Sequence, residues 1–310
     1  MRAEHPSLEP ASRARFSGFA DLYDAQRPSP PPRLGPLLAG YANSARPAVV
    51  DLGSGTGLSS RWAATWARSV IAIEPNDEMR AAAQSRPIPG IDYRAGVAQD
   101  TGLGPSSADL VLVVQAMHWM EPDATLAEVA RILRPGGVLA VVDADWPPVS
   151  GVARAERAWA VLHGRIRVLE ARLAAGDAGA SLRRPISPDD PALAHDDLAD
   201  PHRHRVLPDG LRSWSKTDHL ARMRASGRFA FTREIVMLDR AGGGPDRFTA
   251  LLYSQGSYQG LLKAGLSRED IGATAFEAEV AAGFAEARWV PELSFCWRVR
   301  LGVTPTAAPA

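Results

Sequence analysis

Cysteine is almost absent from this chain of 310 residues, and the single one is Cys296. One cysteine cannot form an internal disulfide, so a disulfide-stapled scaffold is excluded, and its apolar surroundings favour a buried thiol. No apolar run reaches the roughly 18 residues that a membrane-spanning helix requires. The opening residues, MRAEHPSLEP, lack the hydrophobic region of a signal peptide. We therefore predict a cytoplasmic protein with no membrane partner.

Net charge is also absent, because 35 Lys and Arg residues balance 35 Asp and Glu residues. A chain without excess positive charge lacks long-range attraction for a polyanion, which disfavours nucleic acid as a partner. Hydrophobic residues make up 45% and charged residues 23%, as in ordinary globular proteins. The sequence leaves a monomer and a homodimer equally open.

Apolar strand segments alternate with helical segments in the first half of the chain. Strands are predicted at residues 49–52, 69–73, 91–95, 110–114 and 138–142. Such alternation predicts a parallel sheet with helices on both faces, and it places ligands at the carboxyl ends of the strands. The predicted fold class is therefore α/β.

A glycine-rich turn follows the first of these strands. Residues 49–60 read VVDLGSGTGLSS, with Asp51 inside the strand and glycines at Gly53, Gly55 and Gly57. Glycine admits positive φ and lets a ligand approach the backbone, while the next helix presents free N–H groups. The spacing differs from the G-x-G-x-x-G of dinucleotide sites, and the Gly-Lys pair of phosphate loops is missing. The turn predicts a site for another small-molecule cofactor.

The D-x-G-x-G-x-G spacing resembles the first motif of class I S-adenosylmethionine-dependent methyltransferases. In that family the glycine turn lies under the amino-acid portion of the cofactor. The resemblance implies a Rossmann-like, seven-stranded and mostly parallel sheet, with S-adenosyl-L-methionine as the cofactor. It also implies that five residues of the turn bind the cofactor: Asp51, Gly53, Ser54, Gly55 and Gly57.

An acid ends the second predicted strand. Glu74 lies 23 residues after Asp51, and its two carboxylate oxygens can accept hydrogen bonds from both ribose hydroxyls. Pro75 follows it and is included in the predicted cofactor site. Met79 is either an adenine contact or a core methionine.

The loop after the third strand reads GVAQD over residues 96–100. It resembles the segment that holds adenine in this family, where an acid commonly receives the amino group. Val97 stands where that acid often stands. The candidates for the adenine contact are therefore the backbone of Ala98 and the side chain of Gln99 or Asp100.

The fourth strand ends in QAMHW at residues 115–119, which resembles the A-x-H-W form common in one large family of this class. The resemblance implies a position beside the sulfonium. Gln115 is a predicted contact to the cofactor's amino group. His118 is either a general base or a histidine packed at the start of a helix.

The segment FADLYDAQRP, residues 19–28, is similar to the family's lid, in which an aromatic residue and an arginine close over the methionine moiety. Tyr23 and Arg27 are the candidates, with a plain surface helix as the alternative. Tyr23 is also the second candidate for a catalytic base. No metal site is predicted, because the histidines at positions 195, 202 and 204 have no acids at ligand spacing.

The regular alternation stops near residue 150. A long helix is predicted at 152–174, and 176–211 is an aperiodic segment that we interpret as a cover over the substrate site. Helices at 246–264 and 268–285 lie between two further strands. These strands are predicted at residues 229–238 and 293–303.

The predicted organisation has five parts, of which the third is a helical and loop insertion after the fifth strand. They are N-terminal lid helices (1–48), a cofactor-binding core (49–150), the insertion (151–214), the C-terminal part of the core with the last two strands (215–304) and a tail (305–310).

Three functions are compatible with these residues. The first is in-line methyl transfer to a small-molecule acceptor, as in secondary or antibiotic metabolism. The second is an enzyme of the same fold that closes the cofactor's aminocarboxypropyl chain to a small ring amino acid and releases methylthioadenosine. The third is a non-catalytic cofactor-binding protein, against which the intact Asp51, Gly53, Gly55 and Glu74 count. The acceptor atom is left open.

Overall fold

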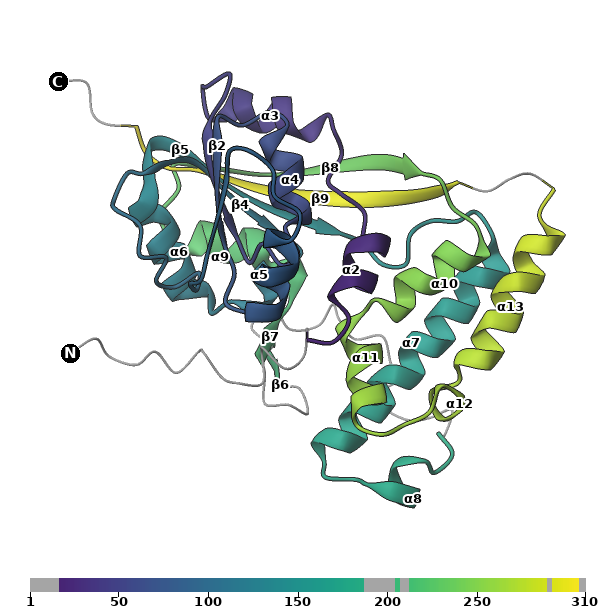
Figure 1. The fold of residues 1–310 in the computed structure, drawn as a ribbon. Helices are drawn as coiled ribbons and strands as arrows, with labels where there is room; N and C mark the ends of the chain where they lie inside the picture. The colour runs from purple at the N-terminus through teal and green to yellow at the C-terminus, as the bar shows by residue number, and fades with distance from the viewer. Residues whose placement is uncertain (1–16, 187–203, 207–211, 289–291, 307–310) are drawn as a thin grey trace.

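One sheet of seven strands organises the protein, in the order β3-β2-β1-β4-β5-β9-β8 (Figure 1). The computed structural model describes residues 17–186, 204–206, 212–288 and 292–306, the second range by its backbone alone. β9 runs antiparallel to both of its neighbours, and the other neighbouring strands of this sheet pair in parallel. The predicted α/β fold with a mostly parallel sheet is confirmed.

The first five strands form the parallel part of the sheet. They are β1 (Ala48–Leu52), β2 (Ser69–Ile73), β3 (Ile91–Arg94), β4 (Ala108–Val114) and β5 (Leu133–Ala144). β1 and β4 are almost wholly buried, because helices cover both faces of the sheet. Strand order reverses between β1 and β4, which is where a ligand site is expected.

Helices lie on both faces of this parallel part. Alternate residues of β1 and β4 face opposite ways, so Val49 and Leu110 join one core cluster while Val50 and Val111 join the other. The first cluster packs against α3 (Leu34–Tyr41) and α4 (Leu58–Ala64), and the second against α6 (Pro122–Ile132) and α9 (His219–Ala225). Two further helices of this half are α2 (Ala20–Gln26) and α5 (Asp77–Gln84).

Local capping explains where the helices of this half begin. α5 starts at Asp77 because the Asn76 side chain accepts hydrogen bonds from the next backbone N–H groups. α6 begins two residues before the predicted 124, because Glu121 caps it and Pro122 suits the first turn. β5 begins at Leu133, earlier than the predicted residue 138, because Leu133 already pairs with Ala108 of β4. A shift in register separates this pair from the pairing of Val138 with Leu110.

Helices from two separate segments gather beside the sheet, on the right of Figure 1, and we call them the helical cap. One segment supplies α7 (Ala153–Ala174) and α8 (Gly179–Leu182). The other lies between the last two strands, in the part of the chain that the sequence assigned to the core. It supplies α10 (Pro245–Tyr253), α11 (Gly256–Lys263), α12 (Arg268–Ile271) and α13 (Ala273–Glu286).

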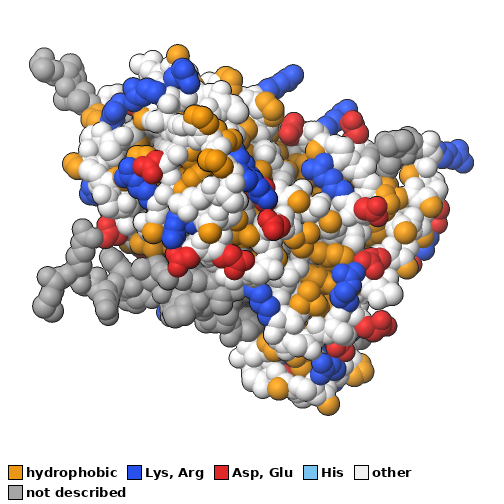
Figure 2. Space-filling view, viewed as in Figure 1, with side chains coloured by type: hydrophobic (Ala, Val, Ile, Leu, Met, Phe, Trp, Pro, Cys, Tyr) orange, Lys and Arg blue, Asp and Glu red, His pale blue; other side chains and the backbone are white. Residues whose placement is uncertain are grey.

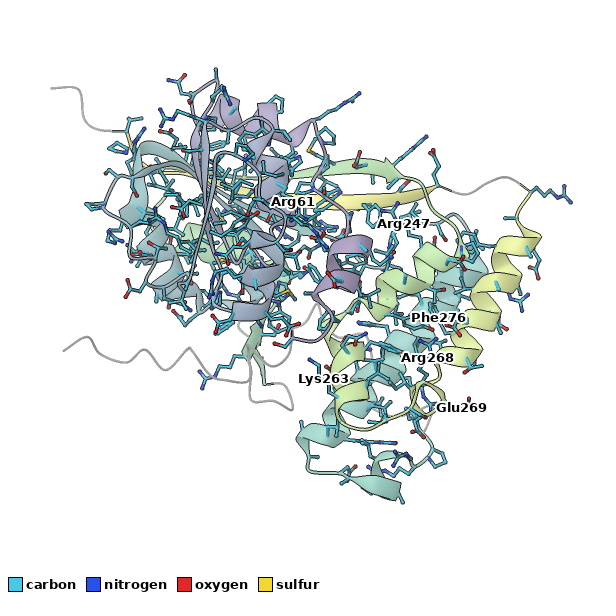
Figure 3. All side chains as sticks on the ribbon, viewed as in Figure 1. Arg61, Arg247, Lys263, Arg268, Glu269 and Phe276 are labelled. Atoms are coloured by element: carbon cyan, nitrogen blue, oxygen red, sulfur yellow. The ribbon has the colours of Figure 1, made fainter. Side chains whose placement is uncertain are left out.

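Aromatic packing joins the two segments of the cap. Trp159 of α7 meets Phe248 of α10 and Phe276 of α13 edge to face, at ring-centroid distances of 5.1 and 6.4 Å. Phe276 lies among the cap helices in Figure 3. The predicted single helices 246–264 and 268–285 are wrong, because the first breaks at residues 254–255 and the second at Gly272, which has a φ of 94°.

Six further elements complete the described part of the chain. They are η1 (Met117–Trp119), β6 (His204–Val206), β7 (Arg212–Trp214), η3 (Lys216–Asp218), β8 (Phe231–Ala241) and β9 (Leu293–Val303). In the described part of the chain, no helix combines the length and the apolar character needed to cross a bilayer. Acidic and basic side chains are intermixed on the face shown in Figure 2, as the balanced composition implies.

Candidate cofactor site

A pocket opens at the carboxyl ends of β1 and β4. Its walls come from the end of the α2 segment, the glycine turn, the end of β4 and Trp146 after β5. The lining residues are Tyr23, Arg27, Pro28, Pro30, Gly53, Ser54, Gly55, Thr56, Leu58, Ser59, Val114, Gln115 and Trp146. The pocket therefore lies where the switch in strand order predicts a ligand.

The three glycines of the turn all adopt the left-handed conformation, with φ of 68° at Gly53, 56° at Gly55 and 81° at Gly57. A Cβ at Gly53 would lie 2.7 Å from the Cβ of Ala116, and one at Gly57 would lie 2.5 Å from the Tyr93 hydroxyl. A Cβ at Gly55 would meet no atom within 4 Å. Packing thus requires two of the glycines, while Gly55 leaves open space in the pocket.

Asp51 fixes the glycine turn through side-chain hydrogen bonds to the helix that follows it. Its Oδ2 accepts hydrogen bonds from the hydroxyls of Ser59 at 2.7 Å and Ser60 at 2.6 Å, which ties β1 to the first turn of α4. Burial raises the pKa of Asp51 to about 6, against the lowering effect of the two serines. Asp51 positions the turn and does not line the pocket.

Glu74 braces the same turn from β2. Its Oε2 accepts a hydrogen bond from the N–H of Gly55 at 2.8 Å, and its Oε1 accepts one from the N–H of Asn76 at 2.8 Å. Burial raises the pKa of Glu74, and these two bonds oppose the rise. Each carboxylate oxygen keeps a second lone pair that can accept a hydrogen bond from a ribose hydroxyl. The ribose contact itself stays a prediction.

Two pocket residues carry polar groups suited to the ends of an amino acid. The Ser54 hydroxyl is buried and has no hydrogen-bond partner in the described structure. Gln115 has a φ of 54°, and its side chain is fixed at both ends. Its Oε1 accepts from Lys216 Nζ at 2.6 Å, and its Nε2 donates to the Ala144 carbonyl at 3.3 Å.

The predicted lid closes one side of the pocket. The Arg27 guanidinium lies 4.9 Å from the ring centre of Tyr23 and 4.7 Å from that of Trp146. It also donates a hydrogen bond to the carbonyl of Ser254 in the helical cap at 3.2 Å. Burial lowers the pKa of Arg27. Both lid residues therefore line the pocket.

Asp24 anchors the lid to the glycine turn, and sequence reasoning missed it. Its Oδ1 accepts a hydrogen bond from the Thr56 hydroxyl at 2.7 Å and pairs with Arg61 of α4. Its Oδ2 pairs with Arg86. Figure 3 shows Arg61 beside α2. Nothing local distinguishes Asp24 from its neighbour Asp21, because its partners come from distant segments.

The residues predicted for the adenosine half do not line this pocket. Glu74 and Met79 are buried, with Pro75 beside them, while Ala98 and Gln99 lie in a turn closed by the bridge between residues 97 and 100. Part of this side is covered by the start of the described chain. Gly18 N donates to Glu78 Oε1 at 2.5 Å, next to the adenosine-side residues.

A buried charged cluster lies next to Gln115. Ligand atoms of His118, Asp143 and His219 lie within 4.8 Å of one another. Arg300 donates to Asp143 Oδ2 at 2.9 Å, and Lys216 Nζ lies 3.3 Å from Oδ1. These two cations neutralise the carboxylate and would repel a metal ion, so we assign none.

His118 belongs to this cluster and does not line the pocket. Burial lowers the pKa of His219 to about 4, so that histidine is neutral at pH 7. Sequence reasoning missed Asp143, although an acid near the end of an apolar strand is the signal that singled out Asp51. His195 and His202 lie outside the described residues, as does the side chain of His204.

Comparison with known proteins agrees with this geometry. Residues 50–141 match the methyltransferase domain family. An uncharacterized methyltransferase of Mycobacterium tuberculosis is 37% identical over 128 residues, which cover 41% of this chain and 51% of the relative. One from Schizosaccharomyces pombe is 31% identical over 122 residues, covering 39% of this chain and 48% of the relative. The matches thus span about half the length of these curated relatives.

A solved structure described as a methyltransferase, from Anaeromyxobacter dehalogenans, shares the fold. It superposes with a TM-score of 0.54 and 20% identity, covering 90% of this chain and 99% of that one. Residues 50–141, from β1 into β5, therefore match a methyltransferase domain, in line with the resemblance of the glycine turn to class I S-adenosylmethionine-dependent methyltransferases, whose cofactor is S-adenosyl-L-methionine. The open space at Gly55 and the unpartnered hydroxyl of Ser54 fit the amino-acid end of this cofactor.

Proposed function

We propose that this protein transfers a methyl group from S-adenosyl-L-methionine to a small-molecule acceptor. The observation that carries the proposal is the pocket over the glycine turn, closed by the lid residues Tyr23 and Arg27. Catalysis requires that water be excluded around the bound reactants, and holding the two reactants in line is worth about 7–11 kcal/mol of the barrier. When bound, the cofactor supplies an activated methyl group on a sulfonium.

The cofactor's two ends are assigned to different parts of the site. Gly53, Ser54 and Gly55 take the carboxylate and ammonium, because they line the pocket and the Ser54 hydroxyl has no hydrogen-bond partner in the described structure. Arg27 and Gln115 complete this end. Asp51 and Gly57 support the turn. The adenosine end is assigned to Glu74 for the ribose, with Pro75, Met79, Ala98 and Gln99 around the adenine.

The acceptor enters from the side of the helical cap. Trp146 lines the pocket and stacks on Trp159 of α7, with parallel rings 6.2 Å apart, so the wall of the pocket continues into the aromatic core of the cap. An aromatic wall suits an acceptor with apolar surface. The absence of net charge in the sequence argues against a nucleic-acid acceptor, and its composition favours a reaction in the cytoplasm.

Two residues are candidates for a base that removes the acceptor's proton. Tyr23 lines the pocket, and its ring packs under Arg27. His118 lies in the neighbouring cluster with Asp143. A base is needed only for a weakly acidic acceptor such as a phenol, since an amine can lose its proton to water.

The proposal is tested by incubating the purified chain with methyl-labelled S-adenosyl-L-methionine and a panel of phenols, amines and thiols. We expect label in one acceptor, with equimolar S-adenosylhomocysteine. Methylthioadenosine formed without an acceptor would instead indicate ring closure of the cofactor's own chain. Cofactor binding without turnover across the panel would indicate a binding protein.

A matched pair of variants tests the assignment of Glu74. Glu74→Gln keeps the shape and removes the charge that accepts hydrogen bonds, so we expect cofactor affinity to fall by about tenfold or more. Asp92→Asn, on the exposed side of β3, is the control and should bind as the wild type does. Equal affinities of all three proteins would contradict the assignment.

A further inference from the structure

β8 is the last strand of the seven-stranded sheet, so one of its edges is unpaired in the described structure. The strand is 11 residues long, contains no proline and pairs with β9 in unbroken register. Three of its hydrophobic side chains are exposed: Phe231 by 45%, Val236 by 53% and Leu238 by 72%. A long edge of this kind is a template for another strand, and soluble proteins commonly cover or blunt it.

Hydrogen bonds of β9 show which of its backbone groups face β5. Thr304 N, just after β9, donates to the carbonyl of Gly137 in β5 at 2.9 Å. Past the end of β5, Asp145 N donates to the carbonyl of Cys296 at 2.8 Å, and Val149 exchanges two hydrogen bonds with Ser294 at 2.8 Å. Since backbone groups alternate in direction along a strand, the even-numbered residues of β9 face β5 and the odd-numbered residues face β8.

The register between β8 and β9 then identifies the free backbone groups of β8. Met237 lies opposite Trp297, and Asp239 lies opposite Phe295, so the odd-numbered residues of β8 bond to β9. The even-numbered residues therefore direct their N–H and C=O groups to the open edge. Val236 is the central residue of this even-numbered set.

The charges along β8 are arranged symmetrically about Val236. Arg233 precedes it by three residues, and Asp239 follows it by three. Neither has an ion-pair partner among the described residues; Arg233 makes one long contact of 3.5 Å to the Tyr41 hydroxyl. Glu234, in contrast, is already held by Arg300 at 2.8 Å.

We infer that β8 pairs antiparallel with β8 of a second copy of this chain, with Val236 on the two-fold axis. Val236 then forms a hydrogen-bonded pair with its own counterpart, through groups that face the open edge. Arg233 of each copy lies opposite Asp239 of the other, at a non-hydrogen-bonded position where side chains are closest. The two copies form one continuous sheet of fourteen strands, twice the seven of one chain.

Other registers do not satisfy these charges. An axis at Glu234 sets two glutamates against each other and leaves Asp239 beyond the paired strands. An axis at Leu238 sets Asp239 against Met237. Axes at the odd-numbered residues 235 and 237 set Arg233 or Asp239 against apolar residues. Only the axis at Val236 pairs both charges and also brings the exposed valines together.

Sedimentation velocity across a range of protein concentrations tests the dimer. We expect the wild type to dimerise reversibly. Arg233→Asp sets an acidic side chain opposite Asp239 at both places in the dimer where these positions meet. The repulsion should raise the dimer dissociation constant by about tenfold or more. The double exchange Arg233→Asp with Asp239→Arg should restore it to within about threefold of the wild type. Arg228→Asp, at an exposed position just before β8, is the control and should have no effect.

Cross-linking tests the register independently. In a Cys296→Ser background, Val236→Cys should form a disulfide-linked dimer under mild oxidation, because a hydrogen-bonded pair separates the Cα atoms by about 5.5 Å. Thr232→Cys should stay monomeric on a denaturing gel, because its counterpart lies eight residues along the partner strand. A monomeric wild type, a dimer insensitive to both charge variants, or cross-linking at 232 with none at 236 would overturn the inference.

Discussion

The glycine turn and the helical cap are held together by different forces. The turn depends on polar groups at short sequence separation: Asp51 holds two serines of α4, and Glu74 holds the N–H groups of Gly55 and Asn76. The cap depends on aromatic packing between segments far apart in the chain, centred on Trp159. The difference indicates that the hydrogen bonds bracing the glycine turn join nearby elements, whereas the proposed acceptor wall depends on packing between remote ones.

Trp159→Ala should have the largest effect, and it should fall mainly on the cap. Trp159 is 2% exposed, and removing its ring leaves a cavity that costs about 3–5 kcal/mol of unfolding free energy. Denaturant unfolding measures this loss. Cofactor affinity should stay within about threefold, because Trp159 does not line the pocket.

Val161→Ala is the control for that substitution, since Val161 lies on the same helix and is 73% exposed. It should cost less than about 0.5 kcal/mol. If Trp159→Ala abolished cofactor binding while the protein stayed folded, the cap and the glycine turn would be one unit, and the comparison would fail.

Gly53→Ala should damage the other region. Its φ of 68° disfavours alanine by about 1–2 kcal/mol, and the new methyl would lie 2.7 Å from Ala116 Cβ, which adds about 1–3 kcal/mol. Calorimetric titration with S-adenosylhomocysteine should show at least a 100-fold loss of affinity, about 2.7 kcal/mol.

Gly104→Ala is the matched control for the turn. A Cβ there meets no atom within 4 Å, and its φ is not in the left-handed region. It should bind the cofactor normally. Normal binding by Gly53→Ala as well would show that the turn does not form the cofactor site.

Asp51→Asn should change how stability depends on pH. The pKa of Asp51 rises from 3.8 to about 6 on folding, so protonated Asp51 stabilises the fold at low pH and this stability is lost as pH rises from about 4 to 6. Asparagine resembles the protonated form. The variant should therefore gain up to about 3 kcal/mol relative to the wild type across that window.

Denaturant midpoints measured for both proteins between pH 4 and 7 give this difference directly. Titration of other groups, including His219, is common to both proteins and cancels. A difference that stays flat over the window would mean that Asp51 keeps its ordinary pKa in the folded chain.

Asp24→Asn should have the smallest effect, because it loosens only the lid. The substitution weakens the ion pairs that hold α2 against Arg61 of α4 and Arg86, just after α5. We expect cofactor affinity to fall by about tenfold, since ion pairs of partly buried groups are worth about 1–2 kcal/mol together. Asp21→Asn is the control, because the Asp21 side chain is 94% exposed. Equal losses of cofactor affinity in Asp24→Asn and Asp21→Asn would contradict the role of Asp24 in holding the lid.

The sequence was most informative where a structure depends on neighbouring residues. Spacing predicted the glycine turn, and periodicity predicted the strands and the mostly parallel sheet, because both depend on residues a few positions apart. Asp24 and Lys216 were missed, since their partners are remote in sequence and no local pattern marks them. Asp143 does end an apolar strand, but its partners Arg300 and Lys216 are equally remote. The assembly of the helical cap was not predicted for the same reason, because its two segments meet only through tertiary contacts.

The breaks within the cap helices were also beyond the sequence pattern. Residues 246–264 keep helical spacing across the break at 254–255, so periodicity alone predicts one helix. The break matters for the site, because it presents the Ser254 carbonyl to Arg27 of the lid. The lid, the pocket and the cap thus meet at a point that only the folded chain defines.

The most direct measurement is a calorimetric titration of the wild-type chain with S-adenosylhomocysteine, repeated with NAD⁺. The glycine turn, with its D-x-G-x-G-x-G spacing and the open space at Gly55, should bind one S-adenosylhomocysteine per chain and give no heat with NAD⁺. Absence of binding to S-adenosylhomocysteine, or equal binding of both ligands, would contradict the assignment of this pocket.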